Sequence, residues 1–221
     1  MTPATQPQRP FRVPPDATEI ILVRHGASQP AVRDEPFVLV DGHSDPPLAP
    51  EGHEQAERVA ERLRGEPLKA IFVTSLQRTI QTAAPLARAI GFEPVAIPEL
   101  REVRLGEWEG GELRFRFAER DPLIARLFAE QRWDVIPGAE PAEELAARTR
   151  AGLDRVVEAT GPGATAAAFV HGGVIGELCR QATGAQGLAF IHADNGSLSR
   201  LVVFADGRRL LRSFNDTAHL A

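Results

Sequence analysis

Short apolar runs alternate with amphipathic stretches along most of the chain. Runs such as Ile20-Ile21-Leu22-Val23 and Ala70-Ile71-Phe72-Val73 are bounded by turn residues, which is typical of buried β-strands. Ala166 to Val170 follows the same pattern. Apolar positions recur at helical spacing in four further stretches, residues 50–64, 76–90, 142–159 and 174–183. The alternation predicts an α/β fold of three layers, α/β/α, around a mostly parallel central sheet.

Two segments depart from this alternation. Leu198 to Phe204 and Arg209 to Phe214 flank Asp206-Gly207, a pattern that predicts a C-terminal β-hairpin. Residues 99–137 are irregular and rich in charge, with apolar positions that indicate helical pieces, so we expect a cap-like insertion over the sheet edge. Charged, solvated helices without a role at a site are the alternative. Residues 114–132 of this region carry five arginines: Arg114, Arg116, Arg120, Arg126 and Arg132.

Composition is compatible with one globular unit. The chain has 221 residues, 43% of them hydrophobic, and a formal net charge of −5. This acidic balance argues against a non-specific nucleic-acid binder. Cys179 is the single cysteine, so no intramolecular disulfide can form, and no apolar run approaches the ~18 residues that cross a membrane.

The N-terminal residues are proline-rich and polar and lack the apolar stretch of a signal peptide. We expect residues 1–17 to form a flexible tail and residues 18–221 to form a single domain that contains the insertion. A cytoplasmic protein is the default expectation.

Candidate chemistry gathers where the predicted strands end. Arg24-His25-Gly26 follows the first strand, and His171-Gly172-Gly173 follows the strand that begins at Ala166. After the run that ends at Val73, Ser75 is a candidate N-cap, and Arg78 falls in the first turn of the helix. Carboxyl strand ends and helix N-termini are where open α/β sheets bind anions. One histidine or arginine in a turn is commonplace, but the recurrence at three junctions predicts a phosphoryl site.

These residues also fit a known family. Leu22-Val23-Arg24-His25-Gly26 resembles the opening motif of the histidine phosphatase superfamily, also called phosphoglycerate-mutase-like, and the similarity extends over most of the chain beyond the tail. Further segments are similar to its other motifs: Asp45 to Gly52, Thr74 to Ala83, Leu100-Arg101-Glu102, Gly106 to Gly110, Gly138-Ala139-Glu140 and Val170 to Gly173.

The resemblance implies a fold and a set of roles. The fold would be the phosphoglycerate-mutase-like α/β/α sandwich. His25 would be the nucleophile that forms a phosphohistidine, Arg24, Arg78, His171 and Gly172 would hold the phosphoryl oxygens, and Glu102 would donate a proton to the leaving group. Glu107, in the same segment, is the alternative acid. Ser28 and Asn195 are candidates for substrate contact, although Asn195-Gly196 also has the composition of a simple turn.

Physical chemistry supports these roles. A neutral imidazole is nucleophilic, and phosphoryl transfer mainly needs positioning and charge stabilisation, which arginines supply. No metal or other cofactor is then required. We therefore expect a metal-independent phosphomonoester hydrolase acting on a small phosphorylated metabolite, with no nucleic-acid or membrane partner. The arginine-rich insertion suggests a polyanionic substrate, and the resemblance is compatible with a homodimer.

Three alternatives remain open at this point. A phosphoglycerate mutase is one, but Gln29 to Val32 replaces the Trp-Asn pair usual there in those mutases, and the chain has no tyrosine. A catalytically silent phosphate-binding scaffold is the second. The third is a metallohydrolase built from His43, Asp45 and His53, whose spacing is not that of a zinc site. We expect His43 to be an exposed loop residue, with contact to the substrate as the alternative.

Overall fold

The computed structural model describes residues 7–221, and the first six residues of the predicted tail lie outside it. Its central feature is a six-stranded sheet with the order β5-β4-β6-β1-β7-β8. The first four strands of that order are parallel, and β7 and β8 join them as an antiparallel hairpin. The strands are β1 (Thr18–Arg24), β4 (Leu68–Val73), β5 (Val95–Ala96), β6 (Thr165–Val170), β7 (Leu198–Val203) and β8 (Arg209–Asp216).

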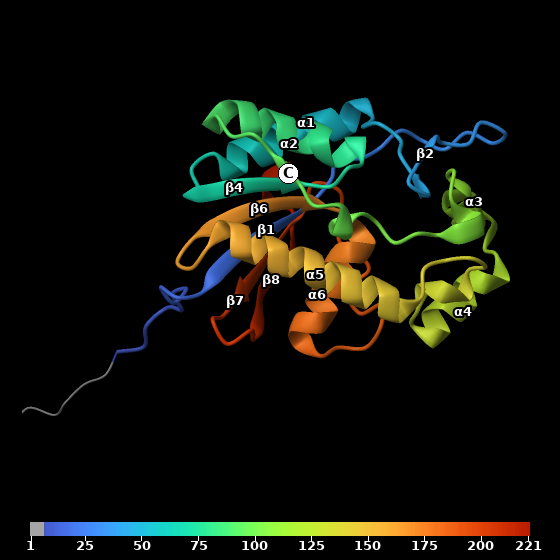
Figure 1. The fold of residues 1–221 in the computed structure, drawn as a ribbon. Helices are drawn as coiled ribbons and strands as arrows, with labels where there is room; N and C mark the ends of the chain where they lie inside the picture. The colour runs from blue at the N-terminus through green and yellow to red at the C-terminus, as the bar shows by residue number, and fades with distance from the viewer. Residues whose placement is uncertain (1–6) are drawn as a thin grey trace, which may run out of the picture.

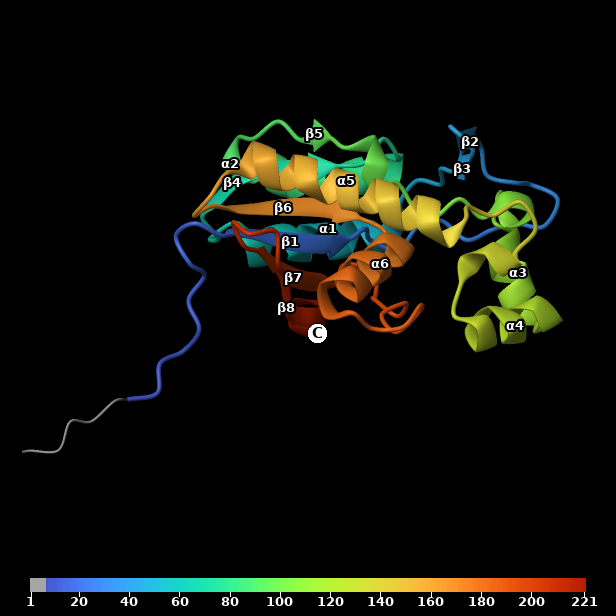
Figure 2. The same cartoon turned by 60° about the horizontal axis from the view of Figure 1, so that its bottom comes forward.

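Helices cover both faces of the sheet (Figures 1 and 2). Alternate residues of β1 belong to different cores: Ile21 packs with the α1–α2 side and Ile20 with the α5–α6 side. This three-layer arrangement and the mostly parallel sheet confirm the predicted fold class. The covering helices are α1 (Pro50–Leu63), α2 (Gln77–Ile90), α5 (Ala142–Thr160) and α6 (Gly172–Thr183).

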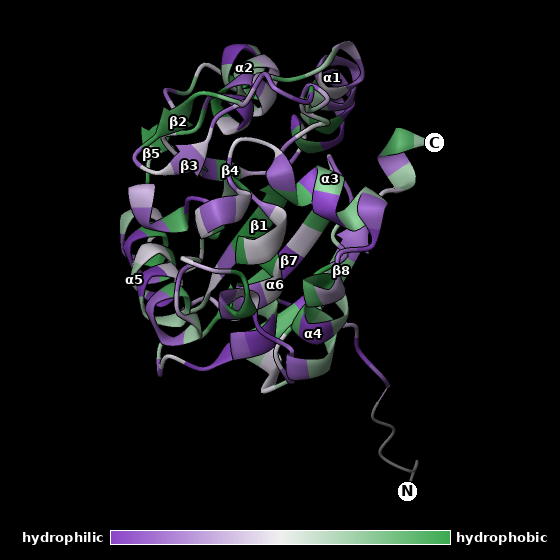
Figure 3. Ribbon diagram, turned by 90° about the vertical axis from the view of Figure 1, so that its right-hand side faces the viewer, coloured by the Kyte–Doolittle hydropathy of each residue, from purple (hydrophilic) through white to green (hydrophobic). Residues whose placement is uncertain are grey.

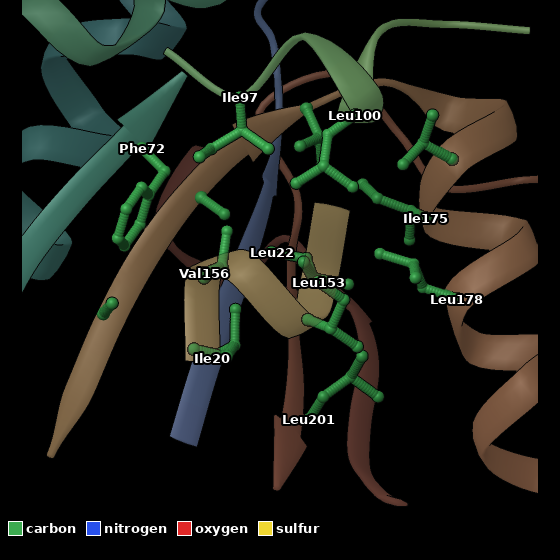
Figure 4. Close-up of a cluster of buried hydrophobic side chains, with 14 of the residues drawn as sticks. Ile20, Leu22, Phe72, Ile97, Leu100, Leu153, Val156, Ile175, Leu178 and Leu201 are labelled. Atoms are coloured by element: carbon green, nitrogen blue, oxygen red, sulfur yellow. The ribbon is translucent and has the colours of Figure 1, made fainter. Parts of the chain in front are cut away.

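The larger core lies between the sheet and the α5–α6 layer. Figure 4 shows Ile20 and Leu22 of β1 facing Leu153 and Val156 of α5, all at most 2% exposed. Cys179 belongs to this cluster, as its place on an apolar helix face predicts. In Figure 3, which views the end of the molecule that carries α3, the covering helices are banded green and purple because only one face of each is apolar.

The irregular region forms short helices beyond the strand ends, on the right of Figure 1. It contains α3 (Glu112–Glu119), α4 (Pro122–Glu130) and the 3-10 turns Pro98–Leu100, Gly106–Trp108 and Trp133–Val135. Trp108, Leu127, Val135 and Ile136 give it a small core of its own. A separate hairpin of β2 (Leu39–Val40) and β3 (His43–Ser44) lies at the same end, and the chain closes with the 3-10 turn η4 (Ala218–Leu220). Among residues 7–221 no helix is both long and apolar enough to cross a bilayer.

One local prediction was wrong. Ser75 does not cap α2: the N-cap position is Leu76, and the buried Ser75 hydroxyl has no partner in the described part of the chain. Thr74 and Thr79 take over the local bonds instead. The Leu76 N–H donates to Thr74 Oγ1 at 3.3 Å, and Thr79 Oγ1 donates to the Leu76 carbonyl at 2.8 Å. These two hydrogen bonds hold the turn that leads into Arg78.

Candidate active site

Three adjacent strand ends deliver the predicted residues to one place. β1 and β6 are parallel neighbours, and the His25 N–H donates to the Val170 carbonyl at 3.0 Å, so the two histidine turns start side by side. The His25 and His171 ring centroids are 5.2 Å apart. β4 lies on the other side of β6, and the helix after it brings Arg78 Nε within 3.1 Å of His25 Nε2.

The hydrogen bonds of His25 define its tautomer. Nδ1 lies 2.7 Å from the Gly26 carbonyl, which can only accept, so Nδ1 carries the proton. Nε2 therefore keeps its lone pair and accepts from Arg78. Burial, followed by the charges of Arg78 and Arg24, holds the pKa of His25 well below its usual value. The imidazole is neutral at pH 7, with the Nε2 lone pair facing Arg78.

His171 is fully buried at the N-cap of α6. Its Nε2 lies 3.0 Å from the Thr74 hydroxyl, and its Nδ1 has no partner among the described residues. Burial first, and then the charge of Arg78, lowers the pKa of His171 well below the usual range. The N–H of Gly172, at the first position of the helix, is one that the helix itself does not use.

The two arginines are held by backbone carbonyls. Arg24 Nη1 donates to the Ala193 carbonyl, and its Nε is buried with no hydrogen-bond partner among residues 7–221. Arg78 Nη1 donates to the Ser44 carbonyl at 2.8 Å and lies 3.8 Å from the Asp45 carboxylate. Burial lowers the pKa of both guanidiniums, and the charge of Glu102 opposes that effect at each.

Glu102 and Glu107 have different surroundings. Glu102 lines the same cavity as His25, and its Oε1 accepts from the N–H groups of Val103 at 2.9 Å and Gly173 at 3.1 Å. The carboxyl group of Glu102 therefore lies at the N-terminus of α6, where the helix dipole favours negative charge. Glu107 is exposed and does not line the cavity. Of the two candidate acids, only Glu102 lines the cavity that contains His25.

A cavity of about 360 Å³ is lined by Arg24, His25, Arg78 and Glu102. Residues of the insertion, among them Leu105, Trp108 and Leu113, form part of its wall, so the insertion borders the cavity as expected of a cap. Ser28 and Asn195 line it too. Gly196 has a φ of +74°, as an Asn-Gly turn requires, and Asn195 Nδ2 also donates to the His25 carbonyl at 2.9 Å. Asn195 thus occupies both a turn and the cavity.

The prediction that His43 is an exposed loop residue was wrong. His43 is only 8% exposed and lines the cavity, because the β2–β3 hairpin folds inward. Its neighbour Ser44 is tied to the insertion: the Ser44 N–H donates to Glu109 Oε2 at 2.7 Å. Sequence reasoning did not assign Ser44 or Glu109 to the site, although both lie inside or beside motifs that it singled out.

The insertion arginines divide into two groups. Arg114 lines the cavity and donates to the Ser28 hydroxyl at 2.8 Å and to the Gln29 carbonyl at 2.6 Å. Burial, and then repulsion from Arg24, lowers the pKa of Arg114. Arg116, Arg126 and Arg132 instead form ion pairs with acidic neighbours outside the cavity, and Arg120 ends α3 without lining it. Of these five arginines, only Arg114 lines the cavity, so the expectation that the insertion binds a polyanionic substrate rests on Arg114.

The residues proposed for a metallohydrolase do not form a cluster. His53 is exposed on α1, whereas His43 is buried. Within residues 7–221 no group of three or more histidine, cysteine, aspartate or glutamate side chains is placed to hold a metal ion.

Comparison with protein families decides the classification. The model of the histidine phosphatase superfamily, branch 1, matches residues 20–217. The chain belongs to this superfamily. The chain has relatives of different lengths. It is 32% identical over 207 residues to the bifunctional protein Rv2228c of Mycobacterium tuberculosis, with 92% of this chain and 55% of that protein covered. The chain thus spans about half the length of the first curated relatives.

A second relative matches over nearly its whole length. The probable phosphoglycerate mutase GpmB of Yersinia enterocolitica is 32% identical over 209 residues, covering 91% of this chain and 94% of that protein. Among solved structures, Bacillus stearothermophilus YhfR has a TM-score of 0.77 at 22% identity, covering 92% and 100% of the two chains. The mycobacterial glucosyl-3-phosphoglycerate phosphatase Rv2419c with inorganic phosphate has a TM-score of 0.72 at 25% identity, covering 92% and 99%.

Proposed function

We propose that this histidine phosphatase hydrolyses a phosphomonoester of a small metabolite through a phosphohistidine on His25. The observation that carries the proposal is the state of His25: a buried, neutral imidazole whose Nε2 lone pair lies 3.1 Å from the Arg78 guanidinium. The two cations near His25 disfavour the binding of a proton by its imidazole and favour the binding of an anion beside it. A phosphate group is the anion that the motif resemblance implies.

The proposed phosphate site consists of donors that point at one region. Arg24 has a buried Nε without a partner, Arg78 faces His25, and the Gly172 N–H lies at a helix N-terminus. Arginine and helix N-termini are both suited to phosphate oxygens. His171 Nδ1, buried and unpartnered, is a fourth polar atom beside His25. These groups would neutralise the charge that spreads over the phosphoryl oxygens in the transition state.

The reaction would proceed in two transfers. In the first, the His25 Nε2 lone pair attacks phosphorus as the P–O bond to the leaving group breaks, and the Glu102 carboxyl gives its proton to the departing oxygen. In the second, water attacks the phosphohistidine, Glu102 takes up the water proton, and His25 is released with inorganic phosphate. Two steps with good geometry replace one difficult step.

Arg114 supports a substrate with more than one anionic group. It is a third cation on the cavity wall, and burial beside Arg24 costs it favourable solvation. A carboxylate or second phosphate on the leaving group would relieve this repulsion. One similar protein is named a glucosyl-3-phosphoglycerate phosphatase, and another is named a probable phosphoglycerate mutase. Both names refer to phosphoglycerate, a compound that carries a carboxylate in addition to its phosphate.

Mutase activity is the second candidate, because the GpmB relatives carry that name. Against it stand Gln29 to Val32 after the first motif and the absence of tyrosine from the chain. Product analysis separates the two. A hydrolase releases inorganic phosphate, whereas a mutase transfers the phosphoryl group to a second hydroxylated acceptor and releases little.

The test is phosphate release from an aryl phosphate in the presence of a chelator, for the wild type and His25→Ala. Release by the wild type and its loss in the variant, with both proteins folded, is the expected result. Equal release by both proteins would overturn the role of His25. Abolition of wild-type release by the chelator would overturn the metal-independent mechanism.

A further inference from the structure

The C-terminal tail reaches the segment that supports the nucleophile. Residues 193–196 lie against Arg24 and His25 through four contacts. Arg24 Nη1 donates to the Ala193 carbonyl, and Asn195 Nδ2 donates to the His25 carbonyl at 2.9 Å. The Gly196 N–H is shared between the Arg24 carbonyl at 3.0 Å and the His25 carbonyl at 3.3 Å. Any displacement of this segment therefore moves the backbone of the nucleophile.

His219 holds the same segment from its outer side. Its Nε2 lies 3.0 Å from the Gly196 carbonyl, and because a carbonyl only accepts, Nε2 is the donor. Gly196 is buried, so water does not readily replace this bond. Burial lowers the pKa of His219, which keeps the imidazole neutral with its one proton on Nε2. Gly196 thus donates to the nucleophile's backbone on one side and accepts from the tail on the other.

Other contacts fix the tail in place. Leu220 packs so closely that a Cβ on Gly196 would lie 3.3 Å from its side chain. Arg58 of α1 donates to the carbonyls of Leu220 and Ala221, the latter at 3.2 Å. Asn215 pairs with Asp194 through both halves of its amide, accepting from the backbone N–H at 2.6 Å and donating to the carboxylate at 2.7 Å.

We propose that His219 is a positioning residue, and that residues 215–220 form a clamp which fixes the backbone of Arg24 and His25 through Gly196. This tail carries His219 and Leu220 side by side, and the phosphoryl chemistry leaves both without a role. The clamp explains both: the imidazole supplies the bond to Gly196, and the leucine covers that bond. The effect on turnover rests on the proposed function, whereas the effect on the Gly196 segment does not.

The experiment compares His219→Ala, His219→Gln and Thr217→Ala. Gln places an amide N–H near the position of the histidine Nε2, so it can restore the bond. The Thr217 hydroxyl makes no hydrogen bond in the part of the chain that the structure describes, so Thr217→Ala is a control within the same tail. Each variant is measured for kcat, for KM, and for hydrogen exchange at the Gly196 amide.

We expect His219→Ala to lower kcat on the order of tenfold or more with a small change in KM, because misplacement of a reacting group by about 1 Å can cost a factor of a hundred. His219→Gln should recover most of kcat, and Thr217→Ala should match the wild type. Exchange at Gly196 should accelerate in His219→Ala alone. The melting temperature of His219→Gln is measured as well. A value close to that of the wild type ensures that the kinetics of at least one variant of His219 come from a folded protein.

Two results would overturn the proposal. The first is unchanged Gly196 exchange in His219→Ala. The second is a loss of kcat that the glutamine variant does not recover, or that Thr217→Ala reproduces. If the wild type hydrolyses no phosphomonoester, the proposed function fails, and the exchange data still decide whether the clamp exists.

Discussion

The Nε of Arg78 donates a hydrogen bond to Nε2 of His25 at 3.1 Å. The Nε2 lone pair, which we propose attacks phosphorus, therefore points at the Arg78 guanidinium. The same contact opposes protonation of the imidazole, since a proton on Nε2 would face the Arg78 N–H. In the proposed mechanism, this one pair of side chains would both prepare the nucleophile and bind the phosphate.

This relationship predicts the charge state of His25 over a range of pH. The pKa of His25 lies well below its usual value near 6.5, so the ring stays neutral as the pH falls through 6.5, where a free histidine gains its proton. In ¹⁵N spectra at pH 6 we expect the neutral tautomer with its proton on Nδ1. The signal is assigned by its loss in His25→Ala, and a titration midpoint near 6.5 would contradict this account.

The role of Glu102 predicts a dependence on the leaving group. Glu102→Gln cannot donate a carboxyl proton, so kcat for an alkyl phosphate should fall roughly 10²–10⁴-fold. A nitrophenyl phosphate, whose leaving group needs little protonation, should be affected far less. Glu107→Gln is the matched control, because Glu107 is exposed and outside the cavity. A similar loss for both substrates, or a loss in the control, would remove Glu102 from the role of acid.

Arg114 and Arg116 form a second matched pair. Both lie on α3, but only Arg114 lines the cavity, while Arg116 pairs with Glu112 and Asp121. Arg114→Ala should reduce kcat/KM roughly tenfold to a hundredfold for a phosphomonoester with a second anionic group, as expected for loss of a hydrogen bond to a charged group. For a neutral aryl leaving group the reduction should be smaller. Arg116→Ala should leave both unchanged, and equal kinetics for the two variants would refute the assignment.

Close backbone packing behind the nucleophile predicts a large effect on stability. A Cβ at Gly26 would lie 2.4 Å from the carbonyl oxygen of Gly52 in α1, so Gly26→Ala must push the nucleophile turn away from the helix. Overpacking of this kind costs about 1–3 kcal/mol. At Gly65 an added Cβ meets nothing within 4 Å, so Gly65→Ala should change the unfolding free energy by less than about 1 kcal/mol. Urea unfolding of the two variants measures the difference.

The sequence predicts the local parts of this structure well. Apolar runs such as Ile20 to Val23 alternate between two buried faces, and the motif residues Arg24, His25, Arg78 and His171 follow strand ends whose convergence is a property of parallel sheets. The fold class and the clustering of these four side chains follow from that rule. The roles assigned to them stay predictions until the variants are measured.

What the sequence did not predict depends on docking between distant segments. His43 is buried because the β2–β3 hairpin is tied to the insertion through Ser44 and Glu109, which are 65 residues apart in the chain. Ser75 does not cap α2, because the hydroxyls of Thr74 and Thr79 make the hydrogen bonds of this turn. Arg114 and Arg116 both lie on α3, and only the positions of their side chains distinguish them: Arg114 lines the cavity, whereas Arg116 pairs with acidic neighbours. Neither helical spacing nor composition contains that information.

The most direct test of the account is to trap the phosphoenzyme. Wild-type protein and His25→Ala are mixed with a phosphomonoester, quenched within milliseconds at alkaline pH, where phosphohistidine survives, and analysed by intact mass and peptide mapping. The account predicts one added phosphoryl group, on His25, in the wild type and none in the variant. A phosphoryl group on another residue, or rapid turnover by the wild type with no phosphoenzyme in the burst, would contradict it.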